Sequence, residues 1–168
     1  MTNWLITQTT RFKAAVTGAG AVEHAANWGN DDETWDDAWY LGGQPWENPQ
    51  IYQSEAALFR FDKVETPTHL VQGGADIRVS YLEGGTMERA FQQLGIPHSF
   101  LVFPGEGHGL PKNPWHGYIK LREELKWLET YAGKQQVRKQ ICAEDANYGS
   151  RGTPSRIFLI GTHESHRP

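Results

Sequence analysis

The sequence predicts an α/β protein in which about three parallel strands are flanked by helices. Three short apolar segments, near residues 13–17, 68–72 and 99–103, run into Gly or Pro, which is typical of buried strands that end in turns. Helical patterns follow them, most clearly over 82–94 and 118–131, where apolar residues recur every three or four positions. Strands that alternate with helices at these spacings form parallel sheets through right-handed crossovers.

The other elements have weaker signals. Residues 1–11 space their apolar side chains as a helix does, but no capping residue precedes Met1, Trp4 and Leu5. The acidic and aromatic residues of 27–50, followed by several Gly and Pro residues, predict a long surface excursion with a little helix. A short helix is expected over 53–61.

Composition and charge exclude several classes of protein. The chain has 168 residues and a formal net charge of -4, which is typical of a single globular domain and makes nucleic acid a poor candidate partner. No apolar run approaches the ~18 residues of a membrane span, so we expect no membrane association. The only cysteine, Cys142, has no partner for an internal disulfide, which favours a reducing compartment, and we expect a cytoplasmic protein.

The character of the sequence changes near residue 133. Beyond it basic residues outnumber acidic ones, and the only apolar cluster is 157–160. No periodicity there predicts packing on a sheet. We therefore interpret 1–132 as the folded portion and 133–168 as an irregular tail whose sequence could be non-native, for example the product of a frameshift or a cloning junction.

Two loops that follow predicted strands carry the residues of chemical interest. Asp76 lies in the loop after 68–72, and His108 lies in the glycine-rich loop after 99–103. Because parallel strands deliver their carboxyl ends to the same edge of a sheet, we expect these side chains to lie together. An aspartate that orients a histidine, and a histidine that accepts a proton from a serine, are two members of a nucleophilic triad. The order acid, then histidine, is that of α/β-hydrolases.

Simpler interpretations of these residues stay open at this stage. On spacing alone His108 is compatible with an ordinary loop histidine, and Asp76 with a turn former. The acidic cluster of 31–37 lacks the ligand spacing of a calcium loop and is better explained as a solvated segment. His163 and His166 lack the pattern of a zinc site. No metal or organic cofactor is implied.

Over most of residues 1–131 the sequence resembles the C-terminal part of the peptidase domain of the prolyl oligopeptidase family, in its acylaminoacyl-peptidase or dipeptidyl-peptidase-like branch. The matching stretches are residues 1–32, 67–79 and 103–131. The resemblance implies a partial α/β-hydrolase fold with Asp76 as the triad acid and His108 as the triad histidine. It also implies that Arg78 contacts the carbonyl of a bound peptide, although a surface or ion-pairing arginine is the simpler interpretation.

The sequence departs from the family at the nucleophile. Family members carry a Gly-x-Ser-x-Gly-Gly elbow a few residues before the segment that resembles residues 1–4. That elbow is absent here, and no serine of the chain stands in the same frame. We therefore expect a fragment of a serine hydrolase of the peptidase or esterase type, acting on peptides or esters, with weak or no activity unless it is complemented.

The alternative function is a catalytically inactive scaffold that associates with itself. The strand near 13–17 would normally be interior, and alone it would expose unpaired backbone groups at the sheet edge. We expect that edge to pair with a second copy, with the tail cluster 157–160, or with a complementing N-terminal fragment. Four of the seven tryptophans are compatible either with a substrate pocket or with packing on such a partner, namely Trp35, Trp39, Trp46 and Trp115.

Overall fold

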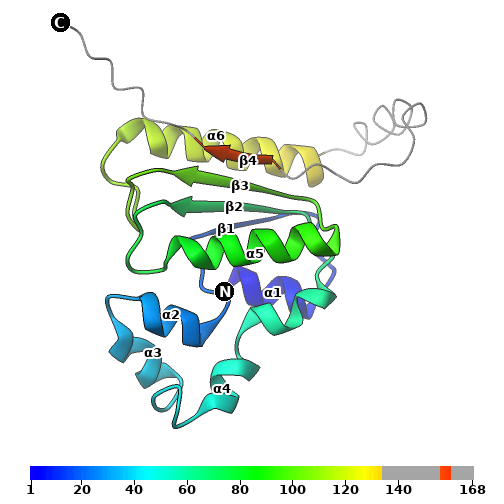
Figure 1. Ribbon diagram of the computed structural model, residues 1–168. Coiled ribbons are helices and arrows are strands. Elements are labelled where there is room, and N and C mark those ends of the chain that lie inside the picture. The colour runs from blue at the N-terminus through cyan, green and yellow to red at the C-terminus, as the bar shows by residue number, and fades with distance from the viewer. Residues whose placement is uncertain (134–155, 160–168) are drawn as a thin grey trace, which may run out of the picture.

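The structure is a parallel sheet with helices on both faces (Figure 1). It is a computed structural model that describes residues 1–133 and the strand at 156–159. Helix α6 covers one face of the sheet, while α1 and α5 cover the other. The prediction of an α/β protein with three parallel strands flanked by helices is confirmed.

The elements alternate along the chain as the sequence predicts. Their bounds are α1 Thr2–Gln8, β1 Ala15–Gly18, α2 His24–Asn30, α3 Thr34–Tyr40, α4 Pro49–Ser54, a 3₁₀ helix Ala57–Lys63, β2 Thr68–Gly73, α5 Tyr81–Leu94, β3 His98–Phe103, α6 Pro114–Tyr131 and β4 Arg156–Leu159. Helix α1 has no side-chain cap at Met1, in line with the missing capping signal. Helix α5 ends at Gly95 in the left-handed conformation that favours glycine.

The sheet order is β1-β2-β3-β4, and all three pairings are parallel. The fourth strand is an addition to the predicted three, because it comes from the segment expected to be an irregular tail. It pairs with β3 and so does not cover β1. In the part of the chain that the structure describes, β1 therefore has one neighbour, β2, and its other edge is open.

The core lies on both faces of the sheet because successive strand residues point to opposite sides. Leu70, Phe100 and Val102 face α1 and α5, where they join the large apolar cluster that contains Phe91. The alternate residues Val71, Leu101 and Phe103 face α6 and pack with Leu110 and Ile119. Within residues 1–133 no helix has the length and apolar character needed to cross a membrane.

Polar contacts with α1 and α5 fix β1 and the loop that follows it. The Thr17 hydroxyl donates to Asn3 Oδ1 at 2.7 Å, which ties β1 to α1. Glu83 of α5 accepts hydrogen bonds from the backbone N–H groups of Val22 and Glu23, at 2.7 and 2.9 Å. Burial of this carboxyl raises its pKa, against the lowering effect of the two backbone donors. Strand β1 is thus tied to α1, and the loop that follows it is tied to α5.

Burial of His69 makes the stability of the fold depend on pH. His69 is buried at the start of β2, where Nδ1 lies 2.5 Å from the Ser99 hydroxyl and the ring lies beside Trp127. Burial lowers the pKa of His69, against smaller opposing effects of Glu124 and Glu123. Since the unfolded histidine has a pKa of ~6.5, the unfolded state binds more protons than the native state below that pH.

We therefore expect the unfolding free energy to fall as the pH is lowered below about 6.5, with a contribution from His69 of at most ~1.4 kcal/mol per pH unit. Urea unfolding at pH 7.5 and 5.5 measures this loss. His69→Gln, which keeps a polar group for Ser99, should reduce the difference between the two pH values. An equal loss in the variant would assign the acid sensitivity to another group.

Candidate active site

The carboxyl ends of β2 and β3 bring two loops together. Gly73 and Phe103 are register partners at the ends of these strands. The loops beyond them are joined by backbone hydrogen bonds from Gly74 N to Phe103 O, at 2.9 Å, and from Ala75 N to Glu106 O, at 2.8 Å. Gly73 is required at this contact, because a Cβ there would lie 2.4 Å from the carbonyl oxygen of Gly107. The close approach of the loops is thus set by the backbone.

Asp76 and His108 lie within hydrogen-bonding distance of each other. The distance from His108 Nδ1 to Asp76 Oδ2 is 3.1 Å. The aspartate side chain is 0% exposed, whereas that of the histidine is 49% exposed. The strand ends therefore place a buried carboxylate behind an accessible imidazole, the arrangement expected from the positions of the two loops. Their catalytic roles stay predictions at this point.

The Asp76 carboxylate is held by four donors. Oδ1 accepts hydrogen bonds from the backbone N–H groups of Arg78 and Val79, at 2.9 and 3.0 Å. Oδ2 accepts from Gln72 Nε2 at 3.0 Å as well as from His108. Gln72, which the sequence analysis did not single out, also donates to Val79 O at 2.8 Å. These contacts fix the orientation of the carboxylate toward the imidazole.

The contact with Asp76 determines which nitrogen of His108 is free to react. A carboxylate only accepts hydrogen bonds, so His108 Nδ1 carries the proton in this pair. In the neutral ring the lone pair then lies on Nε2, on a side chain that is half-exposed. This is the tautomer in which a histidine accepts a proton from a hydroxyl.

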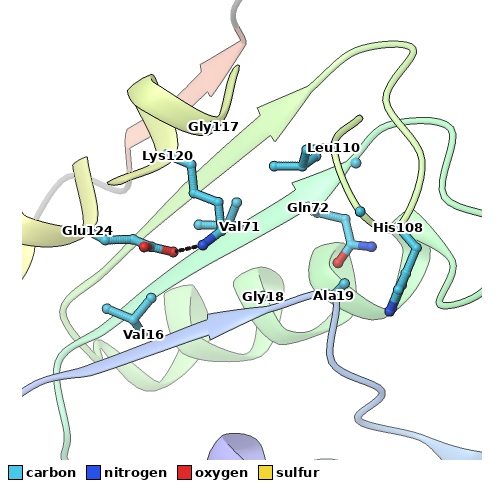
Figure 2. A pocket seen from close by; sticks show the side chains of 12 residues that line it. Val16, Gly18, Ala19, Val71, Gln72, His108, Leu110, Gly117, Lys120 and Glu124 are labelled. Carbon is cyan, nitrogen blue, oxygen red and sulfur yellow. Dashed lines mark ion pairs between the residues drawn. The ribbon is translucent and has the colours of Figure 1, made fainter. Parts of the chain in front are cut away.

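An open pocket of about 630 Å³ lies beside His108, over β1 and β2. Figure 2 shows His108 and Gln72 at one end and the Lys120–Glu124 ion pair, at 2.6 Å, at the other. Val16 and Gly18 of β1 form part of the lining, so the pocket reaches the open edge of the sheet.

Arg78 lies two residues after Asp76, but its guanidinium is occupied by carboxylates. Nε lies 2.6 Å from Asp32 Oδ1, and Nη1 lies 2.9 Å from Glu33 Oε2. The hydrogen bond from Arg78 lowers the pKa of Asp32. Arg78 is therefore an ion-pairing arginine in this structure. The contact of Arg78 with a peptide carbonyl stays a prediction. Within residues 1–133 no three metal-ligating side chains are grouped to hold a metal ion.

A buried carboxylate that the sequence analysis missed lies in the His108 loop. Glu106 Oε1 accepts hydrogen bonds from Asn113 N, at 2.9 Å, and from His116 Nδ1, at 2.6 Å. Its other oxygen accepts from Lys112 N at 3.0 Å. Burial by itself would raise the pKa of Glu106, but these three hydrogen bonds together hold it below its usual value. Glu106 is thus ionised at neutral pH.

The serines within residues 1–133 have other partners. Ser54 donates to Ile51 O, and Ser80 accepts from Leu82 N at the start of α5. Ser99 lies against His69, at the opposite end of the strands from His108. No serine hydroxyl among the residues the structure describes hydrogen-bonds to His108. Ser150, Ser155 and Ser165 lie outside the described residues.

Comparison with known proteins assigns the family. Residues 1–135 match the prolyl oligopeptidase family. The chain belongs to this family. Among its relatives are dipeptidyl-peptidase 5 of Porphyromonas endodontalis, 27% identical over 129 residues, and dipeptidyl-peptidase 5 of Schizosaccharomyces pombe, 30% identical over 125 residues. The matches cover 74% and 72% of this chain and 18% of each relative. The chain therefore spans about a fifth of the length of these relatives.

A solved peptidase structure has the same fold over the matched residues. The acylaminoacyl peptidase of Pyrococcus horikoshii superposes with a TM-score of 0.74 at 25% sequence identity. The superposition covers 78% of this chain and 22% of the archaeal one. The structural neighbours are α/β-hydrolase peptidases, which confirms the expected partial α/β-hydrolase fold.

Proposed function

We propose that this chain supplies the histidine and the aspartate of the catalytic triad of a serine hydrolase that acts on peptides or esters. The observation that carries the proposal is the 3.1 Å hydrogen bond between half-exposed His108 and fully buried Asp76. Membership of a peptidase-type hydrolase family supports it, as do relatives named dipeptidyl-peptidase and acylaminoacyl peptidase.

In the proposed reaction His108 acts as general base and then as general acid. Nε2 takes the proton of a serine hydroxyl while the serine oxygen attacks the carbonyl carbon of the substrate. The same nitrogen then gives that proton to the departing amine or alcohol, which leaves an acyl-serine. Water then gives a proton to His108 Nε2 and attacks the acyl-serine. His108 returns that proton to the serine oxygen, and the acid product is released. Asp76 keeps the Nδ1 proton in place and stabilises the imidazolium formed at each transfer.

The serine itself would come from outside residues 1–133, because the three serines there have other partners. The open edge of β1 is the proposed place of entry. It borders the pocket through Val16 and Gly18, and the same pocket reaches His108. A segment that carries a Gly-x-Ser-x-Gly turn and pairs with β1 would bring its serine to this end of the sheet. This complementing segment is the proposed partner.

Labelling with a fluorophosphonate probe, which reacts with activated serines, tests the proposal. The chain is assayed alone and after co-expression with the elbow-bearing part of the peptidase domain of a dipeptidyl-peptidase 5 relative. We expect no label on Ser54, Ser80 or Ser99, and label on the elbow serine together with ester turnover in the complex. His108→Ala should remove both signals. Label on a serine of residues 1–133, or turnover that survives His108→Ala, would overturn the assignment.

Exposed aromatic side chains favour self-association as the second candidate function. Trp35, Trp39 and Trp46 are 66%, 72% and 68% exposed, and among the described strands one edge of β1 has no neighbour. We propose that, without a complementing segment, the chain pairs with a second copy of itself through this edge.

Size-exclusion chromatography with light scattering is therefore expected to give a mass above the 19.0 kDa of one chain. Val16→Lys, which places a charge on the open edge of β1, should shift the mass toward that of the monomer. A stable monomer of the wild-type chain at micromolar concentration would contradict self-association.

A further inference from the structure

We propose that Glu106 is a positioning residue for His108. Its own buried carboxylate closes the loop between β3 and α6, and this loop carries His108. The inference rests on the proposed function in so far as His108 is the triad base. The geometry of the loop that carries His108 can be measured without catalysis.

The carboxylate of Glu106 joins the two ends of the loop. Glu106 follows β3 by three residues, and its hydrogen-bond donors are the backbone N–H groups of Lys112 and Asn113 and the ring of His116. Asn113 is the N-cap of α6, and its own side chain accepts from Trp115 N at 3.0 Å. One side chain thus pins the start of α6 to the end of β3, and the intervening residues form a closed loop.

His108 lies on this closed loop, and the backbone there is not relaxed. Leu110 has a φ of 52°, in the left-handed region that side chains rarely adopt, at a cost on the order of 1 kcal/mol or more. Such a conformation persists where the surroundings enforce it. The hydrogen bonds to Glu106 on one side and the packing of Leu110 on the α6 face supply that constraint.

The same residue also holds the loop of Asp76. The backbone carbonyl of Glu106 accepts a hydrogen bond from Ala75 N at 2.8 Å, one residue before the aspartate. Glu106 therefore contacts both loops whose side chains meet in the Asp76–His108 pair. A change in the position of its backbone would alter the separation of the two reacting groups.

Stability alone gives a weak reason for this arrangement. Glu106 is buried, and burying a carboxylate costs free energy that its hydrogen bonds must first offset. A second buried Glu–His contact provides the comparison. Glu88 and His98, whose side chains approach to 3.8 Å, lie between α5 and the start of β3, at the opposite end of the sheet from the His108 loop.

Glu106→Gln is the decisive variant because three donors converge on two carboxylate oxygens. Glutamine offers one acceptor, and its amide N–H₂ would meet a donor on the other side. The measurement is the NMR signal of the His108 ring in the full chain, together with hydrogen exchange of the amides of residues 107–112. We expect the downfield Nδ1–H signal of the hydrogen bond to Asp76 to be lost, and loop exchange to accelerate at least ~10-fold.

Glu88→Gln is the matched control, and it should leave both signals of the His108 loop unchanged even if it lowers stability. His116→Gln is the second variant, and we expect a partial change in the same direction because the two backbone donors remain. An unchanged His108 signal in folded Glu106→Gln would overturn the proposal. If Glu106→Gln does not fold, an unchanged signal in His116→Gln would overturn it.

Catalysis gives a separate readout in the complemented enzyme. Glu106→Gln is expected to lower kcat by about 10²-fold with little change in KM, since misplacement of a catalytic group by about 1 Å costs on this order. Failure of complementation with a changed His108 signal would overturn the proposed function and leave the positioning role intact. A full kcat in Glu106→Gln would overturn the positioning role.

Discussion

Asp76→Asn is expected to lower the turnover of the complemented protein by about 10⁴-fold. The asparagine would still fill the buried site, but it carries no charge to stabilise the imidazolium of His108. Its amide N–H₂ would also face a donor, because both oxygens of the native carboxylate accept hydrogen bonds. The donors are Arg78 N, Val79 N, Gln72 Nε2 and His108 Nδ1. An amide that donates to Nδ1 favours the tautomer with its proton on Nε2, which cannot act as the base.

The measurement is steady-state ester hydrolysis, with circular dichroism to establish that the variant is folded. Asp36→Asn in helix α3 is the matched control, since Asp36 lies outside the pocket beside His108 and should keep full turnover. A loss below ~10-fold in folded Asp76→Asn would show that the carboxylate does not serve the base, and would remove the main support for a triad.

The parts of the site that could be predicted from the sequence are those set by strand direction. Asp76 and His108 follow two neighbouring parallel strands, so their meeting requires only that both strands end at the same edge. The partners of Asp76 and His108 were not predictable in this way. Gln72 hydrogen-bonds to Asp76 from within β2. Glu106 hydrogen-bonds to His116, which is ten residues later in the sequence. No helical or strand periodicity in the sequence indicates either contact.

Long-range charge contacts were missed for a related reason. Arg78 and Asp32 are 46 residues apart, and nothing in the local sequence of either residue indicates the other. The acidic cluster was predicted to be a solvated segment, but the Asp31 side chain is only 9% exposed and Asp36 and Asp37 lie in helix α3. The contact of the cluster with Arg78 depends on how the segment folds back on the loop after β2. Only the tertiary fold supplies that information.

The boundaries of some helices could have been predicted better from local signals. Helix α6 begins at Pro114, four residues before the predicted start, with Asn113 as its cap, and proline is favoured in the first turn of a helix. The excursion of 27–50 contains most of α2 and all of α3, and α2 is capped by Glu23, a residue type that rarely serves as an N-cap. The strand at 156–159 had no signal beyond its apolar cluster.

Gly73→Ala is expected to have the largest effect on the fold. A Cβ at this position would lie 2.4 Å from the carbonyl oxygen of Gly107 and 2.6 Å from that of Glu106, and both contacts are with backbone atoms. Backbone of a hydrogen-bonded loop cannot move aside as a flexible side chain does, so the His108 loop must shift away from β2. We expect a loss of about 2–3 kcal/mol in unfolding free energy, together with separation of His108 from Asp76.

Gly85→Ala is the matched control with the opposite sign. Gly85 lies inside helix α5, and a Cβ there would have no atom within 4 Å, so alanine should stabilise the helix by about 0.5–1 kcal/mol. Urea unfolding of both variants measures the two changes in unfolding free energy. The NMR signal of the His108 ring reports whether its hydrogen bond to Asp76 is kept. If Gly73→Ala retained wild-type stability and an unchanged His108 signal, the close backbone contact between the loops would not be what holds the acid and the base together.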